Sequence, residues 1–78
     1  MGITIFTYGT FREGRQKEIH MEHVEKMTLR KVVEILDIDP RALCVVKIND
    51  STGLMEDSLG EKVPNGSCIY FLPFLTGG

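Results

Sequence analysis

The residues best suited to chemistry in this chain are the two glycines that close the printed sequence, Gly77 and Gly78. A terminal glycine carries an α-carboxylate, whose pKa of about 3.3–3.7 leaves it ionised and a poor electrophile at neutral pH. Activation as a mixed anhydride would open its carbon to a nucleophile. Because glycine has no Cβ, a chain end made of two glycines can enter a channel too narrow for other residues. The pair predicts a reactive carboxylate at Gly78, although Gly-Gly is also typical of a frayed terminus or a linker remnant.

The segment before the glycines is unusually apolar for a terminus. Pro73 has no N–H to donate to a sheet, so it is expected to end strand pairing and to project the residues after it away from the sheet. The six residues from Pro73 to Gly78 span roughly 20 Å when extended. Thr76 and Gly77 would thread between the walls of a partner, and strand alternation requires one of Phe71 and Leu72 to point into the core. The predicted partner-binding residues are Phe71, Leu72, Pro73, Phe74 and Leu75.

No other group of reactive side chains in the sequence predicts a metal site or a catalytic site. His20 and His23 would point to opposite faces of a strand, which disfavours a shared metal. Glu56, Asp57 and Glu61 are typical of a solvated acidic loop, or of a contact to a basic partner, more than of an acid–base pair. The chain has no phosphate-binding glycine loop and no Ser/His/Asp set. We therefore expect no metal and no bound cofactor, and any ATP must be held by a partner.

Composition restricts the class of protein further. With 78 residues, 42% hydrophobic and 26% charged, the chain is expected to form one small globular domain. The net charge is −2 and the basic residues are scattered, which argues against nucleic acid as a partner. No apolar run reaches the ~18–20 residues of a membrane span. Cys44 and Cys68 lie in apolar runs, which predicts buried, reduced thiols in a cytoplasmic protein.

One helix is well marked by its apolar spacing. Thr28 is placed to act as the N-cap through its hydroxyl. Pro40 stops the pattern, because the residue before a proline is pushed out of helical geometry. The apolar stripe, at i, i+3, i+4 and i+7, consists of Leu29, Val32, Val33 and Leu36.

Several strands surround this helix in the sequence. Residues 16–24 also contain helix-favouring Gln, Lys, Glu and Met, but the preceding glycine-containing turn favours a β-hairpin. Turns are expected at residues 9–14, 49–53 and 63–66. The predicted strands are residues 3–8, 16–24, 43–48 and 67–72, with a short extended piece at 54–57.

This order predicts an α+β fold with a mixed sheet of four to five strands and one main helix covering one face. The first and last strands are the most apolar, so they are expected to lie side by side, parallel, at the centre. That is the β-grasp, or ubiquitin-like, arrangement. The predicted boundaries are a single domain over residues 1–72 and a flexible C-terminal tail over residues 73–78.

The chain also resembles a known family, the small subunit of molybdopterin synthase. The specific part is the end, where Phe71-Leu72-Pro73-Phe74-Leu75-Thr76-Gly77-Gly78 follows Asn65-Gly66-Ser67-Cys68-Ile69-Tyr70. The front is similar in its first strand, then Phe11-Arg12-Glu13 and Gly14, and a helix that opens at Thr28-Leu29. Two features depart from the family's pattern: Phe74 replaces a second proline, and Asn65-Gly66-Ser67 replaces an acidic turn.

The resemblance implies a sulfur carrier that is not an enzyme on its own. An E1-like enzyme would adenylate Gly78 with ATP, and a sulfur donor protein would supply sulfur to form a thiocarboxylate. The carrier would then dock on the large catalytic subunit of molybdopterin synthase and deliver sulfur to a pterin precursor of a molybdenum or tungsten cofactor. Three alternatives remain open: a carrier of the thiamine pathway, a protein modifier that forms isopeptides through Gly78, and a β-grasp binding module without chemistry.

Overall fold

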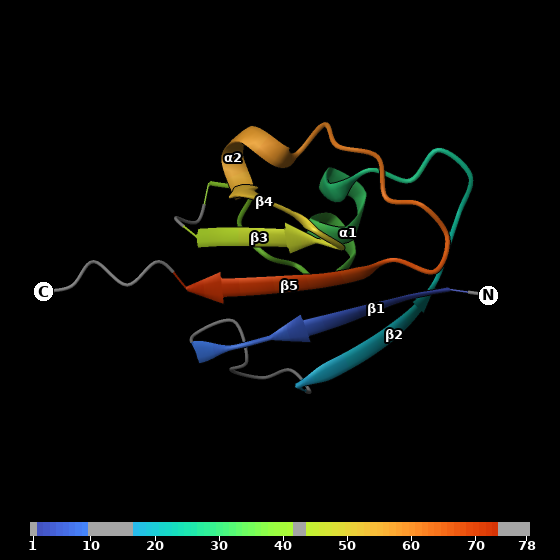
Figure 1. Cartoon of the computed structure of the whole chain (residues 1–78), viewed down its shortest axis with the longest axis horizontal. Helices are drawn as coiled ribbons and strands as arrows, with labels where there is room; N and C mark the ends of the chain where they lie inside the picture. Colours follow the sequence, from blue (N-terminus) through green and yellow to red (C-terminus); the bar gives the residue numbers. More distant parts are fainter. Residues whose placement is uncertain (1, 10–16, 42–43, 74–78) are drawn as a thin grey trace, which may run out of the picture.

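The computed structural model describes residues 2–9, 17–41 and 44–73. Five strands form one mixed sheet in the order β2-β1-β5-β3-β4 (Figure 1). Within the described residues no helix is long and apolar enough to cross a membrane. The elements are β1 (Gly2–Thr7), β2 (Glu18–Glu22), α1 (Leu29–Ile35), β3 (Cys44–Ile48), β4 (Ser51–Leu54), α2 (Met55–Ser58) and β5 (Cys68–Pro73).

The first and last strands are parallel neighbours at the centre of the sheet, as predicted. Ile5 pairs with Ile69, and Thr7 with Phe71. β2 is a strand that pairs antiparallel with β1, which confirms the hairpin prediction. β3 pairs antiparallel with the other side of β5. Because β1 and β5 run in the same direction, β1 begins and β5 ends at opposite ends of the sheet (Figure 1).

Side-chain alternation along these strands builds one core. In β1 and β5 every second residue is buried, and these residues pack with the apolar stripe of α1. Phe71 has no exposed surface and is one of the largest fully buried side chains. Its prediction as a partner-binding residue is therefore corrected: strand alternation turns Phe71 inward and leaves Leu72 half-buried on the other face.

The start of α1 is stabilised differently from the prediction. Thr28 occupies the N-cap position, but its side chain makes no capping hydrogen bond. Instead, the backbone N–H groups of Leu29 and Arg30 donate to the carbonyl oxygens of Glu61 and Leu59, at 3.0 and 3.1 Å. The unpaired donors of the first turn thus find their acceptors in a segment about 30 residues further along the chain, and not in a local hydroxyl.

The region after β3 also differs from the prediction. β4 begins at Ser51, inside the predicted turn, because the turn needs only two residues and Asn49 takes a left-handed φ of 54°. Of the piece predicted as extended at residues 54–57, only Leu54 lies in a strand, because the single-turn helix α2 begins at Met55. This turn places Met55 in the core, where it is fully buried.

Replacement of Phe71 by alanine should destabilise the domain by about 3–5 kcal/mol, because it removes a buried aromatic ring and leaves a cavity. Leu72→Ala, one residue away and only half-buried, is the matched control and should cost roughly 1 kcal/mol. Urea denaturation of both variants measures the difference. Equal losses of stability would contradict the assignment of Phe71 to the core.

Candidate functional site

The carboxyl end of β5 is held on two sides. Pro73 is the last residue of β5 and pairs with Cys44 of β3, so the sheet extends one residue past the predicted boundary at residue 72. On the other side lies Gly9, whose φ of +59° favours glycine. A Cβ on Gly9 would lie 2.5 Å from Cγ of Pro73. The loop after β1 therefore needs glycine here to approach Pro73 closely.

Next to Pro73, the sheet face that points away from the core carries apolar side chains. We call them the outer patch: Phe6, Val45, Leu54, Tyr70 and Leu72. The rings of Phe6 and Tyr70 are stacked, with centroids 4.8 Å apart and planes 10° from parallel. Leu54 is 39% exposed, and the other four are half-buried. A cluster of this kind on a sheet face is typical of a protein-binding surface.

Lys47 lies at the border of the outer patch. Its Nζ is 5.6 Å from the centroid of the Tyr70 ring, within the range of a cation–π contact. Lys47 pairs with Tyr70 on β5 and with Thr52 on β4. The outer patch is thus apolar, and one cation lies at its border, next to the ring of Tyr70.

The predicted site residues divide between the described sheet and the part beyond it. Leu72 joins the outer patch and Pro73 ends β5, whereas Phe71 is in the core. The other predicted residues, Phe74, Leu75, Thr76, Gly77 and Gly78, lie outside the described residues. The remaining patch residues, Phe6, Val45, Leu54 and Tyr70, were missed. The signal available for Phe6 and Tyr70 was their alternation with the buried Ile5 and Ile69.

The two cysteines are free thiols, as predicted. Cys44 is buried, with its Sγ 3.9 Å from Sδ of Met55, and burial raises the pKa of its thiol from an ordinary 9.0 to about 11. A thiol with so high a pKa is a weak nucleophile at neutral pH. The prediction of burial is wrong for Cys68, which is only half-buried, on the same face of the sheet as Tyr70.

The two histidines have separate surroundings. His23, after β2, donates from Nε2 to the carbonyl oxygen of Val63 at 2.7 Å, which ties two loops together. His20, on β2, lies 2.7 Å from a carboxylate oxygen of Glu18. Both side chains of that pair are more than half exposed, so the contact contributes little. Within the described ranges, no three His, Cys, Asp or Glu side chains gather as a metal site would need.

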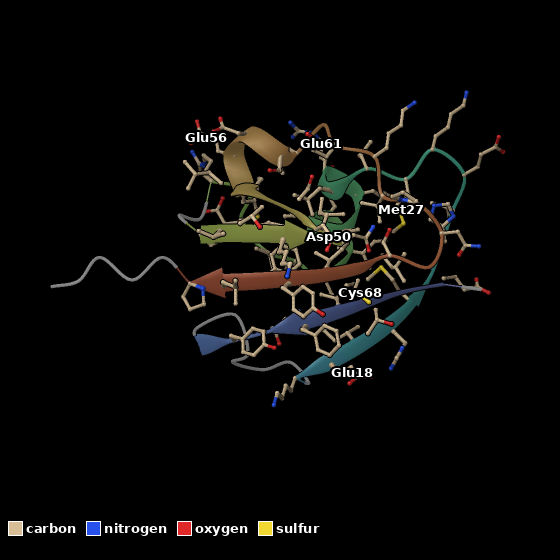
Figure 2. The ribbon with its side chains drawn as sticks, in the orientation of Figure 1. Glu18, Met27, Asp50, Glu56, Glu61 and Cys68 are labelled. Atoms are coloured by element: carbon tan, nitrogen blue, oxygen red, sulfur yellow. The ribbon has the colours of Figure 1, made fainter. Side chains whose placement is uncertain are left out.

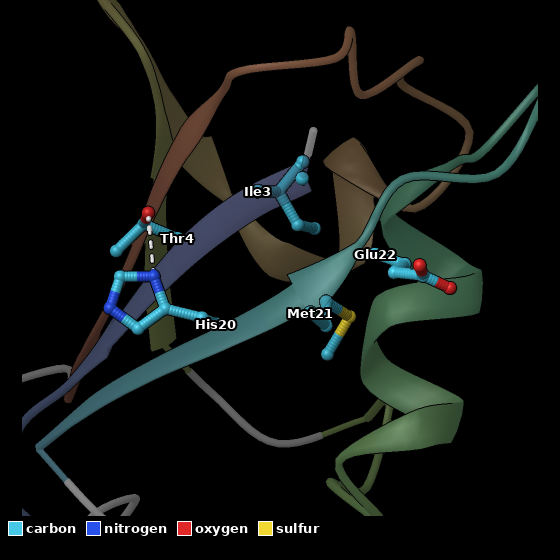
Figure 3. A pocket seen from close by; sticks show the side chains of 6 residues that line it. Ile3, Thr4, His20, Met21 and Glu22 are labelled. Carbon is cyan, nitrogen blue, oxygen red and sulfur yellow. Dashed lines mark hydrogen bonds between the residues drawn. The ribbon is translucent and has the colours of Figure 1, made fainter.

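A hollow of about 450 Å³ lies along the start of β1 and the end of β2. It is lined in part by Thr4 and His20, whose Oγ1 and Nδ1 are 3.4 Å apart (Figure 3). Thr4 is at the end of the β1–β5 pair that lies away from Pro73. The hollow shares no lining residue with the outer patch, although Thr4 lies on the same face of β1 as Phe6.

The acidic residues singled out in the sequence lie on another part of the molecule. Glu56 and Asp57 are in α2, Glu61 follows it, and all three are exposed. Figure 2 shows Glu56 and Glu61 on the α2 side, away from Glu18 on β2. The exposure of these three carboxylates agrees with the prediction of a solvated acidic loop.

The sheet order, the parallel central pair and the main helix on one face define a ubiquitin-like β-grasp domain. A solved structure similar to it is that of a Pyrococcus furiosus protein provisionally assigned as molybdopterin converting factor, subunit 1. The two superpose with a TM-score of 0.70 at 16% identity, covering 95% of this chain and 99% of that one. At this identity the likeness establishes the fold. No protein-family model matches the chain, and no curated protein matches it in sequence.

Gly9→Ala should destabilise the domain by at least about 1–2 kcal/mol, because alanine is strained at positive φ and its Cβ would collide with Pro73. Gly60→Ala is the matched control, since a Cβ there meets nothing within 4 Å. Its stability should change by less than about 0.5 kcal/mol in urea denaturation. A Gly9→Ala variant as stable as Gly60→Ala would disprove the close packing at Pro73.

Cys44 should resist alkylation in the folded protein. At pH 8, a thiol with a pKa of about 11 is ionised to about one part in a thousand. In a Cys68→Ser background, iodoacetamide should label Cys44 only after denaturant is added. The raised pKa also predicts that this group's contribution to stability is complete below pH 9 and is lost as pH rises toward 11. Rapid labelling without denaturant would show that Cys44 is accessible.

Proposed function

We propose that this chain is a sulfur carrier that acts as the small subunit of a molybdopterin synthase, with Gly78 as its reactive residue. An E1-like enzyme would join the Gly78 carboxylate to AMP from ATP and release pyrophosphate. A sulfur donor protein would supply sulfur at the oxidation level of sulfide. The sulfur would attack the acyl carbon, the bond to AMP would break, and a thiocarboxylate and AMP would result. The large catalytic subunit would then use this sulfur.

The observation that carries the proposal is the position of β5. It is the central strand of the sheet, and it ends at Pro73 with five residues of the sequence remaining before and including Gly78. A strand held by neighbours on both sides is a rigid base, so a segment that continues from it can be aimed at a partner's active site. The β-grasp fold, shared over 95% of the chain with a protein assigned as a molybdopterin converting factor subunit, supports the same function.

The outer patch supports docking beside this exit point. Leu72 belongs to the patch and is adjacent in sequence to Pro73, so a subunit that binds the terminal residues could also cover Phe6 and Tyr70. Burial of apolar surface there would supply affinity without using the reactive carboxylate. In this proposal docking and chemistry are carried by neighbouring but different residues.

The deciding measurement is the intact mass of the protein purified from its native cells, with sequencing of the C-terminal peptide. We expect a fraction of molecules whose mass is raised by the exchange of one oxygen for sulfur at Gly78. Lysine conjugates through Gly78 would instead indicate a protein modifier. An unmodified carboxylate under conditions of active cofactor synthesis would contradict the proposal.

Deletion of Gly78 should abolish adenylation by the E1-like enzyme, measured as ATP–pyrophosphate exchange, because the reacting carboxylate is displaced. The melting temperature should not change, since the buried core residues that the structure describes all lie at or before Phe71. The Gly60→Ala variant serves as the control and should exchange at the wild-type rate. Undiminished exchange by the deletion variant would exclude Gly78 as the reactive residue.

A further inference from the structure

Lys47 is in an unusual electrostatic position on the outer face of the sheet. One row of paired residues crosses this face in the order Glu18, Phe6, Tyr70, Lys47 and Thr52, from β2 to β4. Lys47 is half-buried, and within the described residues it makes no salt bridge. Its one described electrostatic contact is the face of the Tyr70 ring, 5.6 Å away.

The acidic group in the same row does not neutralise Lys47. Glu18 is three strand spacings away, roughly 14 Å, which exceeds the screening length of about 8 Å at physiological salt. Glu18 also has a closer partner, His20 at 2.7 Å. The row is therefore polarised, with its cation on β3 and its carboxylate on β2, separated by two stacked aromatic rings.

Covering the outer patch would change the surroundings of Lys47. At present its ammonium group can be hydrated. A partner that packs on Tyr70 and Leu72 would remove part of that water, and a desolvated charge without a counter-charge opposes binding. A cation–π contact at this separation offsets only part of the loss. An anionic group opposite Lys47 would offset this loss, so it favours stable covering of the patch.

We infer that the partner which covers the outer patch, the large subunit in the proposed function on which this inference rests, presents an aspartate or glutamate to the Nζ atom of Lys47. Lys47 then acts as a specificity residue: it admits partners with a carboxylate at that point and disfavours surfaces that are apolar or basic there. With Glu18 at the far end of the row, the pairing also sets the direction in which the partner lies across the sheet.

The direct test is zero-length crosslinking of the complex with a carbodiimide, which joins an amine to a carboxylate only when the two are in contact. The purified large subunit from the same organism is mixed with the full chain, treated and digested, and crosslinked peptides are identified by mass spectrometry. We expect an amide between Lys47 and one acidic residue of the large subunit. A complex that crosslinks only through other lysines would overturn the inference.

Affinities of substituted carriers for the large subunit give an independent readout. Lys47→Met should weaken binding tenfold or more, because it leaves the partner's carboxylate desolvated and unpaired, and Lys47→Glu should weaken it further. Lys47→Arg keeps the charge and should restore binding to within about threefold. Lys31→Met is the matched control, since Lys31 is an exposed residue of α1, on the opposite side of the sheet, and should bind as wild type.

The outcomes separate this inference from the proposed function. If Lys47 faces no carboxylate, removing its charge relieves a desolvation cost, so Lys47→Met would bind as well as wild type or more tightly, and the inference alone would be overturned. If the wild-type chain does not bind the large subunit at all, both fail. Urea midpoints of all variants should match, which shows that affinity and not folding has changed.

Discussion

The structure depends on the parallel pairing of β1 with β5. These strands come from the two ends of the described chain, and their pairing, Ile5 with Ile69 and Thr7 with Phe71, holds the centre of the sheet. The hairpin of β1 and β2 extends the sheet on one side, and β3 with β4 extends it on the other. Without this central pair the two halves of the sheet would be separate. The helix α1 would then have no continuous surface on which to bury its apolar stripe.

The same pairing decides which side chains are available for binding. Because side chains alternate along a strand, the register that turns Ile5, Ile69 and Phe71 into the core also turns Phe6, Tyr70 and Leu72 outward. Stability and recognition are thus set by a single register. A one-residue slip would exchange the two sets and destroy both the core and the outer patch.

Local patterns in the sequence predicted most of the architecture. Apolar density identified the central strands, and the 3.6-residue spacing from Leu29 to Leu36 identified α1. Two of the predictions that failed depended on contacts between distant segments. The acceptors for the first turn of α1 are carbonyls of residues 59 and 61, and α2 forms where Met55 reaches the core. Neither of these contacts can be predicted from a short window of neighbouring residues.

Only the part of the candidate site that depends on neighbouring residues could be predicted from the sequence. The position of Pro73 at the end of the last strand followed from its chemistry, whereas the outer patch combines Phe6, Val45 and Leu54 from three other strands and required the sheet order. Phe71 was misassigned because apolar character alone does not tell a core residue from a binding residue. Strand register does, and it placed Phe71 inside.

The distance in sequence between β1 and β5 has a consequence for how the protein is made. During translation β1 is complete early, yet its central partner is synthesised only when residues 68–73 are added, and the acceptors for α1 come only with residues 59–61. Non-local pairing of this kind delays folding until the loop has been closed. A nascent chain that stops before β5 therefore lacks both its central pair and a closed core. Any molecule that has reached the native fold has been translated at least as far as Pro73, so folding itself selects against chains truncated before the end of the sheet.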